Sequence, residues 1–339
     1  MKNRDGIQFI LVCVIGIVLI GVLIPLADIY NLKIDIDYGS KKTYESEIDN
    51  GIFIKTNNIV LDNFNDNITI SEAGEYNVKG TFNFSILVNA NDKVILNLNG
   101  VDINSKITSA IANRGTNELV INLVDESVNN LKDDGYSVYD GCIYSRGKLT
   151  IGGNGILNIV GNQENGEGIS TTDADIIING GNINIVAKDD GINVGGGDGI
   201  LEINGGNIKI GVSGDGIDSN GKFIMNDGVL NILSGTKGKT TGIDTDNGIE
   251  INGGNIVAFG SSDYQIPLDS STQKFIGFYV KDSIKEDSKI LLVNDEGLEF
   301  ELNASQEFKT LIYSNPNIEE GIYYLYIDDV QTEFSFNVY

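Results

Sequence analysis

The 339-residue chain has no histidine and no tryptophan, and it has only three prolines and two cysteines. Without imidazole there is no Ser-His-Asp or Cys-His nucleophile system, no zinc site of the usual histidine type and no histidine pH switch. Cys13 and Cys142 are far apart in the sequence, and Cys13 lies in an apolar run, which argues against a disulfide framework. Stability must therefore come from apolar burial and from repetition.

Positive charge is also scarce. Lys and Arg number 23 against 48 Asp and Glu, which gives a formal net charge of −25. Nucleic-acid binding needs clustered Lys and Arg, so we expect no nucleic-acid partner. Such a chain suits cations, or sugars that are approached through cations.

The N-terminus contains one long apolar run, residues 7–27, preceded by Lys2 and Arg4. Roughly twenty helical residues cross a hydrocarbon core of about 30 Å. The basic flank predicts a single-pass cell-membrane protein with a cytoplasmic N-terminus and an extracellular remainder. The alternative is a cleaved signal peptide, but the run exceeds the usual apolar region and Pro25-Leu26-Ala27 is a poor cleavage site. We therefore assign residues 1–28 to a membrane anchor and residues 29–51 to a polar stalk.

Internal repeats dominate the middle of the chain. Blocks with a Gly-Gly or Asp-Gly pair followed by alternating apolar residues start about 22 to 28 residues apart. They are residues 178–185, 203–210, 225–232 and 251–258, with a degenerate copy at 151–159. Each block is typical of a strand, a glycine turn and a second strand, and a Gly-Ile pair precedes each one.

Three short strands per repeat without helical periodicity predict an all-β fold, a parallel β-helix over residues 52–262. Propeller blades need longer repeats. The glycine pattern stops after Ser262, and residues 263–339 carry Tyr and Phe in alternating runs. We expect these residues to form a small β cap over the last turn, because an open solenoid end needs a cover.

Acidic residues recur beside the Gly-Ile pairs. The residue before the glycine is Asp140, Glu167, Asp190, Asp215 and then Thr241, and the second residue after it becomes Asn193, Asp218 and Asp244 in the last turns. Equivalent residues of a β-helix stack about 4.8 Å apart, where like charges repel. Lys188 and Lys222 are too few to neutralise them. Oxygen donors without His or thiol favour Ca²⁺, and the predicted metal ligands are Asp189, Asp190, Asp215, Asp218, Asp244 and Asp246. The alternative is that Asp-Gly pairs are good turn formers and the acids are only solvated.

Several segments resemble one known family. They are residues 94–101, 127–133, 143–145 and 149–155, followed by the Gly-Ile and Gly-Gly repeats and by the tail segments 272–274, 311–316 and 321–324. Over about residues 50–339 the chain resembles the carbohydrate-binding β-helix family of clostridial and related bacterial surface proteins. Departures are Asp227-Gly228 in place of Gly-Gly and Glu126-Ser127 in place of Gly-Thr.

The resemblance implies an extracellular right-handed parallel β-helix, similar to pectate lyases in form, that holds calcium. It also implies a polysaccharide partner of the cellulose or polygalacturonate class, without established hydrolysis. Asp189, Asp190, Asp215 and Asp218 match the acidic repeat positions of that family.

We therefore expect a membrane-anchored extracellular protein that binds carbohydrate with the help of Ca²⁺. We favour a protein that is not an enzyme, and we assign no catalytic residue. One alternative is a calcium-dependent, pectate-like polysaccharide lyase with a Lys or Arg base. Its candidate bases are Arg146, Lys188, Lys209, Lys222, Lys237 and Lys239, none within a motif. Another is a structural or adhesive surface protein. The composition also leaves open a glycosidase with two carboxylates.

Overall fold

The computed structural model describes residues 52–134, 139–164, 166–236, 238–262 and 270–338. This part of the chain folds into β-strands joined by turns, with one short 3₁₀ helix, Leu61–Asn63. The membrane helix expected over residues 7–27 lies outside the described residues. Within them, no helix has the length and apolar character needed to span a bilayer.

The first sheet, which we call sheet A, is a stack of short parallel strands, one from each turn of the chain. Its strands are β1 (Ile52–Phe53), β3 (Ile68–Ile70), β5 (Ile86–Val88), β7 (Ile111–Asn113), β10 (Ile143–Ser145), β13 (Ile169–Thr171), β16 (Ile192–Val194), β19 (Ile217–Ser219) and β22 (Ile243–Thr245). The first residue of every strand is an isoleucine in register with the next. The Gly-Ile pairs of the sequence therefore mark the entrance to sheet A.

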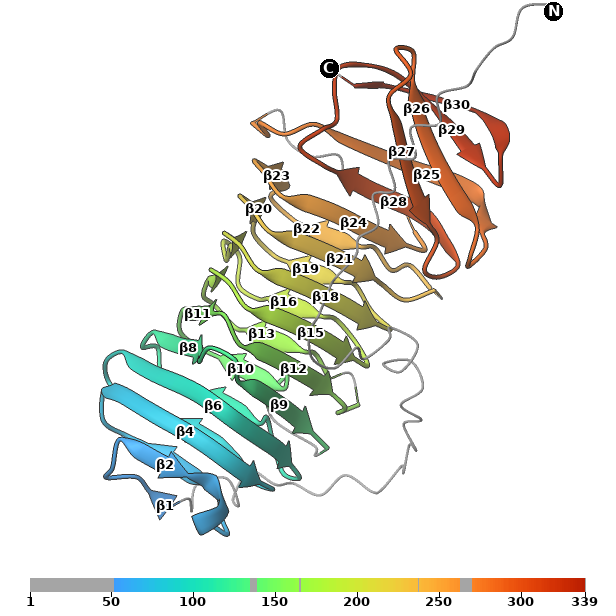
Figure 1. The fold of residues 1–339 in the computed structure, drawn as a ribbon. Helices are drawn as coiled ribbons and strands as arrows, with labels where there is room; N and C mark the ends of the chain where they lie inside the picture. Colours follow the sequence, from blue (N-terminus) through green and yellow to red (C-terminus); the bar gives the residue numbers. More distant parts are fainter. Residues whose placement is uncertain (1–51, 135–138, 165, 237, 263–269, 339) are drawn as a thin grey trace, which may run out of the picture.

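The second sheet, sheet B, forms the other two sides of each turn. One side contains β2 (Asn58–Val60), β4 (Gly74–Phe82), β6 (Val94–Ser105), β8 (Leu119–Leu123), β11 (Leu149–Gly153), β14 (Ile176–Ile178), β17 (Leu201–Ile203), β20 (Phe223–Met225) and β23 (Ile249–Ile251). The other side contains β9 (Val128–Asp133), β12 (Ile156–Gly161), β15 (Asn182–Ala187), β18 (Asn207–Val212), β21 (Val229–Leu233) and β24 (Asn255–Gly260), and the long strands β4 and β6 extend onto it. The predicted parallel β-solenoid is confirmed (Figure 1), whereas its right-handed sense stays a prediction.

Glycine pairs turn the chain between the two sides of sheet B. Gly181 and Gly206 have φ angles of 100° and 96°, in the left-handed region that other residues rarely adopt. A Cβ atom on Gly206 would also lie 2.9 Å from the carbonyl oxygen of Gly181 in the turn below. Both the turn geometry and the close stacking of turns therefore require glycine at the second position of each pair.

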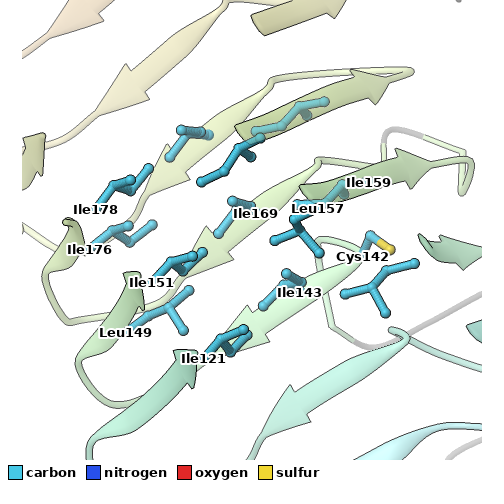
Figure 2. Packing of buried hydrophobic residues seen from close by; sticks show 14 of the residues in the cluster. Ile121, Cys142, Ile143, Leu149, Ile151, Leu157, Ile159, Ile169, Ile176 and Ile178 are labelled. Carbon is cyan, nitrogen blue, oxygen red and sulfur yellow. The ribbon is translucent and has the colours of Figure 1, made fainter. Parts of the chain in front are cut away.

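The core is a column of aliphatic side chains inside the solenoid. Strand alternation sends Ile176 and Ile178 of β14 inward, where both are fully buried, while Ile177 between them faces outward. Figure 2 shows inward side chains of successive turns, such as Ile151 and Ile178, stacked above one another. Because every turn repeats this arrangement, each isoleucine packs on the turn above and the turn below.

This packing makes a direct prediction. Replacing Ile178 by Ala leaves a cavity between two turns and should lower the free energy of unfolding by about 2 to 5 kcal/mol. The same change at the adjacent Ile177, which is outward and partly exposed, should alter it by only about 0.5 kcal/mol. Urea unfolding of both variants measures the difference. Equal losses would contradict the inward and outward assignment.

The last turn is closed by antiparallel strands. β28 (Phe308–Ser314) pairs antiparallel with β24 and with β25 (Phe275–Ile284), which ends the parallel stack. A four-stranded antiparallel sheet, the cap sheet, follows in the order β27 (Glu299–Asn303), β26 (Lys289–Asn294), β29 (Gly321–Ile327) and β30 (Val330–Val338). It stands at the orange and red end of the molecule (Figure 1). A second apolar core containing Phe259, Phe278 and Phe308 joins the cap to the solenoid.

Candidate functional site

The outer surface of sheet A changes from apolar to acidic along the solenoid. The middle residue of each short strand faces outward, and these residues are in register: Leu87, Ala112, Tyr144, Ser170, Asn193, Asp218 and Asp244. The apolar part is covered, because Tyr139 stacks on Tyr144 with ring centroids 4.7 Å apart and Leu87 and Ala112 are fully buried. The open part of the row carries Asn193, Asp218 and Asp244.

A second acidic row precedes sheet A. Glu167, Asp190, Asp215 and Thr241 occupy equivalent positions, because the amides of Gly168, Gly191 and Gly216 donate to the carbonyls of Asp190, Asp215 and Thr241. The predicted stacking is therefore confirmed for these residues. One carboxylate oxygen of Asp190 also accepts a hydrogen bond from the Asp215 amide at 2.7 Å, and Asp215 does the same for Thr241. Asp190 and Asp215 thus each cap the next turn, in agreement with part of the turn-forming alternative.

Asp140 corrects the expected pattern. The amide of Cys142 donates to the carbonyl of Glu167, and Ile143 is in register with Ile169. Gly141, and not Asp140, is therefore the equivalent of Glu167. The expectation that Asp140 belongs to the stacked row is wrong, because this turn has one more residue between the glycine and the strand. Asp140 instead interacts electrostatically with Asp189.

The acids of the two rows, together with neighbouring acids that interact with them electrostatically, form one acidic surface, which we call the acidic face. Its members are Asp140, Glu167, Asp189, Asp190, Asp215, Asp218, Asp244 and Asp246. Burial, and then neighbouring carboxylates, raise the pKa of Asp190 to about 7 and that of Asp215 to about 6. The pKa of Asp218 is raised by burial and by Asp244, Asp246 and Asp189. All six predicted metal ligands are therefore brought into one electrostatically coupled surface.

The two lysines nearest in sequence are engaged elsewhere. The ammonium of Lys188 donates to the backbone oxygen of Asn162 at 2.7 Å, and Lys222 pairs with Glu250 at 3.3 Å. The acidic face therefore keeps an excess of negative charge that these lysines do not offset.

Glu167 is the functional candidate that the predicted ligand set missed. Its side chain is only 5% exposed, and its Oε1 accepts a hydrogen bond from Asn193 at 2.7 Å. Within the part of the chain that the structure describes, its Oε2 is buried and has no hydrogen-bond partner. Burial, with Asp140 and Asp190 nearby, raises the pKa of Glu167 to about 9. Its place before Gly168 was visible in the sequence, but its burial depends on packing between turns.

The acidic face has the donor chemistry of a calcium site without a closed shell. Carboxylate and amide oxygens are the ligands that Ca²⁺ takes, usually six to eight at a time. Among the residues that the structure describes, no three His, Cys, Asp or Glu side chains converge on one point that could hold a metal ion. The predicted ligands therefore lie in rows along the surface.

Comparisons with known proteins agree on one family. The family model described as a carbohydrate-binding domain-containing protein matches residues 64–301. A carbohydrate-binding domain-containing protein of Acetivibrio thermocellus is 34% identical over 131 residues, which are 35% of this chain and 45% of the relative. The match thus spans less than half of that protein's length.

Among solved structures, the polysaccharide lyase-like protein from C. thermocellum is similar to this chain. It is 26% identical with a TM-score of 0.43, and the match covers 56% of this chain and 89% of the other. Because the family model covers more than half of the chain, the resemblance read from the sequence is confirmed: the chain belongs to the carbohydrate-binding domain family.

Proposed function

We propose that this protein binds an acidic, plant-type polysaccharide along the acidic face and does not cleave it. The carrying observation is the row of Asn193, Asp218 and Asp244, which runs along the solenoid on the open part of sheet A. A linear polymer laid along this row would meet an oxygen-rich side chain at each turn, about 4.8 Å apart. Membership in a carbohydrate-binding family supports a polysaccharide as the occupant.

Calcium is the second part of the proposal. An acidic polymer and an acidic surface repel each other unless a cation lies between them. Asp189, Asp190, Asp215, Asp218, Asp244 and Asp246 would hold Ca²⁺, and the ion would supply positive charge to the carboxylates of the sugar. Because no three side chains of the described residues form a closed site, uronate carboxylates and water would complete the shell. Calcium and polysaccharide should then strengthen each other's binding.

Binding without cleavage is favoured by the positions of three of the six candidate bases, Lys188, Lys209 and Lys222. A lyase needs a base beside the carbon next to the uronate carboxyl, and the metal makes that proton acidic. Lys188 and Lys222 are engaged by Asn162 and Glu250. Lys209 lies in sheet B, in register with Asn184 and Asn231. These three lysines are therefore unsuited to serve as the base on sheet A.

The cellular location remains a proposal from the sequence. Residues 7–27 would anchor the chain in the cell membrane, with the solenoid outside, where plant polysaccharides are met. Recovery of the protein with the membrane fraction, and its digestion by protease added to intact cells, would support this arrangement. A protein that is released into the medium without residues 1–28 would contradict it.

Affinity electrophoresis through gels containing polygalacturonate tests the proposed function. The protein should be retarded in millimolar Ca²⁺ and run freely in EDTA, with no rise in ultraviolet absorbance from an unsaturated product. Asp218→Asn with Asp244→Asn should abolish most of the retardation. The matched control, Asp102→Asn with Asp282→Asn, removes the same charge from exposed positions on β6 and β25 and should change nothing. Retardation that survives EDTA would contradict the calcium bridge, and product formation would establish a lyase.

A further inference from the structure

The outer surface of the cap sheet carries an aromatic patch that the acidic face does not use. Strand alternation in β29 buries Tyr323 and Leu325 against the second core, together with Ile290 and Leu292 of β26. Tyr324 and Tyr326 therefore face the opposite side, and both are partly exposed. Two tyrosines two residues apart on one strand lie about 7 Å from each other on the same surface.

The neighbours of the two tyrosines on this surface are small, aliphatic or amide side chains. Tyr324 is in register with Val293 on one side and Ser335 on the other, while Tyr326 lies between Leu291 and Gln331. The Tyr326 hydroxyl donates to Oε1 of Gln331 at 3.2 Å. The hydroxyl of Tyr326 therefore points towards β30. Aliphatic side chains fill the surface on the β26 side.

We propose that this surface, which we call the tyrosine platform, is a second carbohydrate-binding site and that its ligand is a neutral polysaccharide. A pyranose ring with equatorial hydroxyls has two apolar CH faces, which pack on the flat face of an aromatic ring, while its hydroxyls bond to polar groups at the edge. Gln331 and Ser335 supply such groups beside the tyrosines.

The charge around the platform selects against an anionic ligand. Lys289, at the end of β26, pairs with Glu301 at 3.2 Å and with Asp329 at 3.3 Å, so its charge is already neutralised. Glu299 and Glu301 are exposed on β27, on the same side of the sheet as Tyr324 and Tyr326. A uronate carboxyl would meet these acids without a counter-charge. A neutral sugar complements the surface, because its hydroxyls can donate to the same carboxylates.

The platform is separate from the acidic face in position and in chemistry. It lies on the cap, and β29 and β30 follow the residues that the family model matches, which end at residue 301. It needs no metal ion. The inference therefore goes beyond the proposed function, and one site can fail without the other.

Affinity electrophoresis of the full chain in EDTA, with hydroxyethylcellulose as a soluble neutral glucan, tests the platform. Tyr324→Thr with Tyr326→Thr keeps residues that favour strands and should weaken retardation about tenfold. Tyr324→Phe with Tyr326→Phe keeps the ring faces and should bind like the parent. Tyr279→Thr, at a tyrosine of β25 that is 42% exposed, should have no effect.

A second readout uses the unmodified protein, so it does not depend on folding of the variants. The glucan should protect Tyr324 and Tyr326 from nitration while Tyr279 stays reactive, as followed by peptide mass spectrometry. A parent that the glucan neither retards nor protects, or a threonine pair with parent affinity, would overturn the proposal. Polygalacturonate in Ca²⁺ reports on the acidic face separately. If the parent protein binds the glucan but does not bind polygalacturonate in Ca²⁺, the proposed function is refuted and the tyrosine platform stands.

Discussion

In EDTA, the folded protein should lose stability as the pH rises from about 5 to about 9. Glu167, Asp190 and Asp215 have folded-state pKa values of about 9, 7 and 6, above ordinary values of 4.5 and 3.8. Between these limits the folded state holds protons that the unfolded state has released. The stabilisation is complete below the ordinary values and disappears as the pH passes each folded-state pKa.

Melting temperatures measured in EDTA at intervals across this range test the expectation. The midpoint should fall by several degrees between pH 5 and pH 9. Asp133 is fully buried with a pKa raised to about 6, so it contributes in the same direction over the lower part of the range. Glu167→Gln cannot ionise and should remove the fall above about pH 7. A midpoint that is constant or rises with pH would contradict the coupled, buried or half-buried state of these acids.

Calcium should restore part of the stability that is lost at high pH. At pH 8 millimolar Ca²⁺ should raise the melting midpoint by a few degrees, because it offsets the repulsion among ionised carboxylates. A free Ca²⁺ concentration of ten times the dissociation constant would raise the free energy of unfolding by about 1.4 kcal/mol. Asp190→Asn with Asp215→Asn should lose most of the gain. We choose asparagine for these substitutions and not alanine, because its side-chain oxygen can still accept the hydrogen bonds from the backbone amides of residues 215 and 241.

The control for the calcium prediction is again Asp102→Asn with Asp282→Asn, which should respond to Ca²⁺ like the parent. Coincident melting curves in EDTA and in Ca²⁺ for the parent would mean that the acids serve only as turn caps. The hydrogen bonds that the carboxylates of Asp190 and Asp215 accept from amides of the next turn would then be the whole role of these two acids. The calcium bridge of the proposed function would lose its basis.

The repeats made the solenoid predictable. The turns require glycine at positions such as Gly181 and Gly206, and every strand of sheet A starts with isoleucine. These residues therefore recur at regular intervals, and the repeat can be recognised without a structure. The early turns were harder, because β4 and β6 run across two sides of the solenoid with only single glycines, Gly80 and Gly100, at the bends. The antiparallel pairing of β24 with β28 joins residues that are 50 to 58 positions apart in the sequence, so it leaves no local signal.

The candidate site was partly predictable for the same reason. Asp218 and Asp244 follow equivalent glycines, so their register could be read from the sequence. Asp140 was misplaced because the register depends on which residue, Gly141 or Cys142, lies directly before the strand, and the structure places Cys142 there. The burial of Glu167 and the coverage of Tyr144 by Tyr139 arise from packing between turns, which spacing alone does not specify.

Calorimetric titration of the protein with polygalacturonate oligomers, in Ca²⁺ and in EDTA, tests the central claim most directly. The account predicts binding at least about tenfold tighter in Ca²⁺, and an equal increase in calcium affinity when the oligomer is present, because linkage is reciprocal. Asp218→Asn with Asp244→Asn should remove this coupling. Equal affinity in Ca²⁺ and EDTA, or coupling unchanged in that variant, would contradict a calcium-bridged polysaccharide site on sheet A.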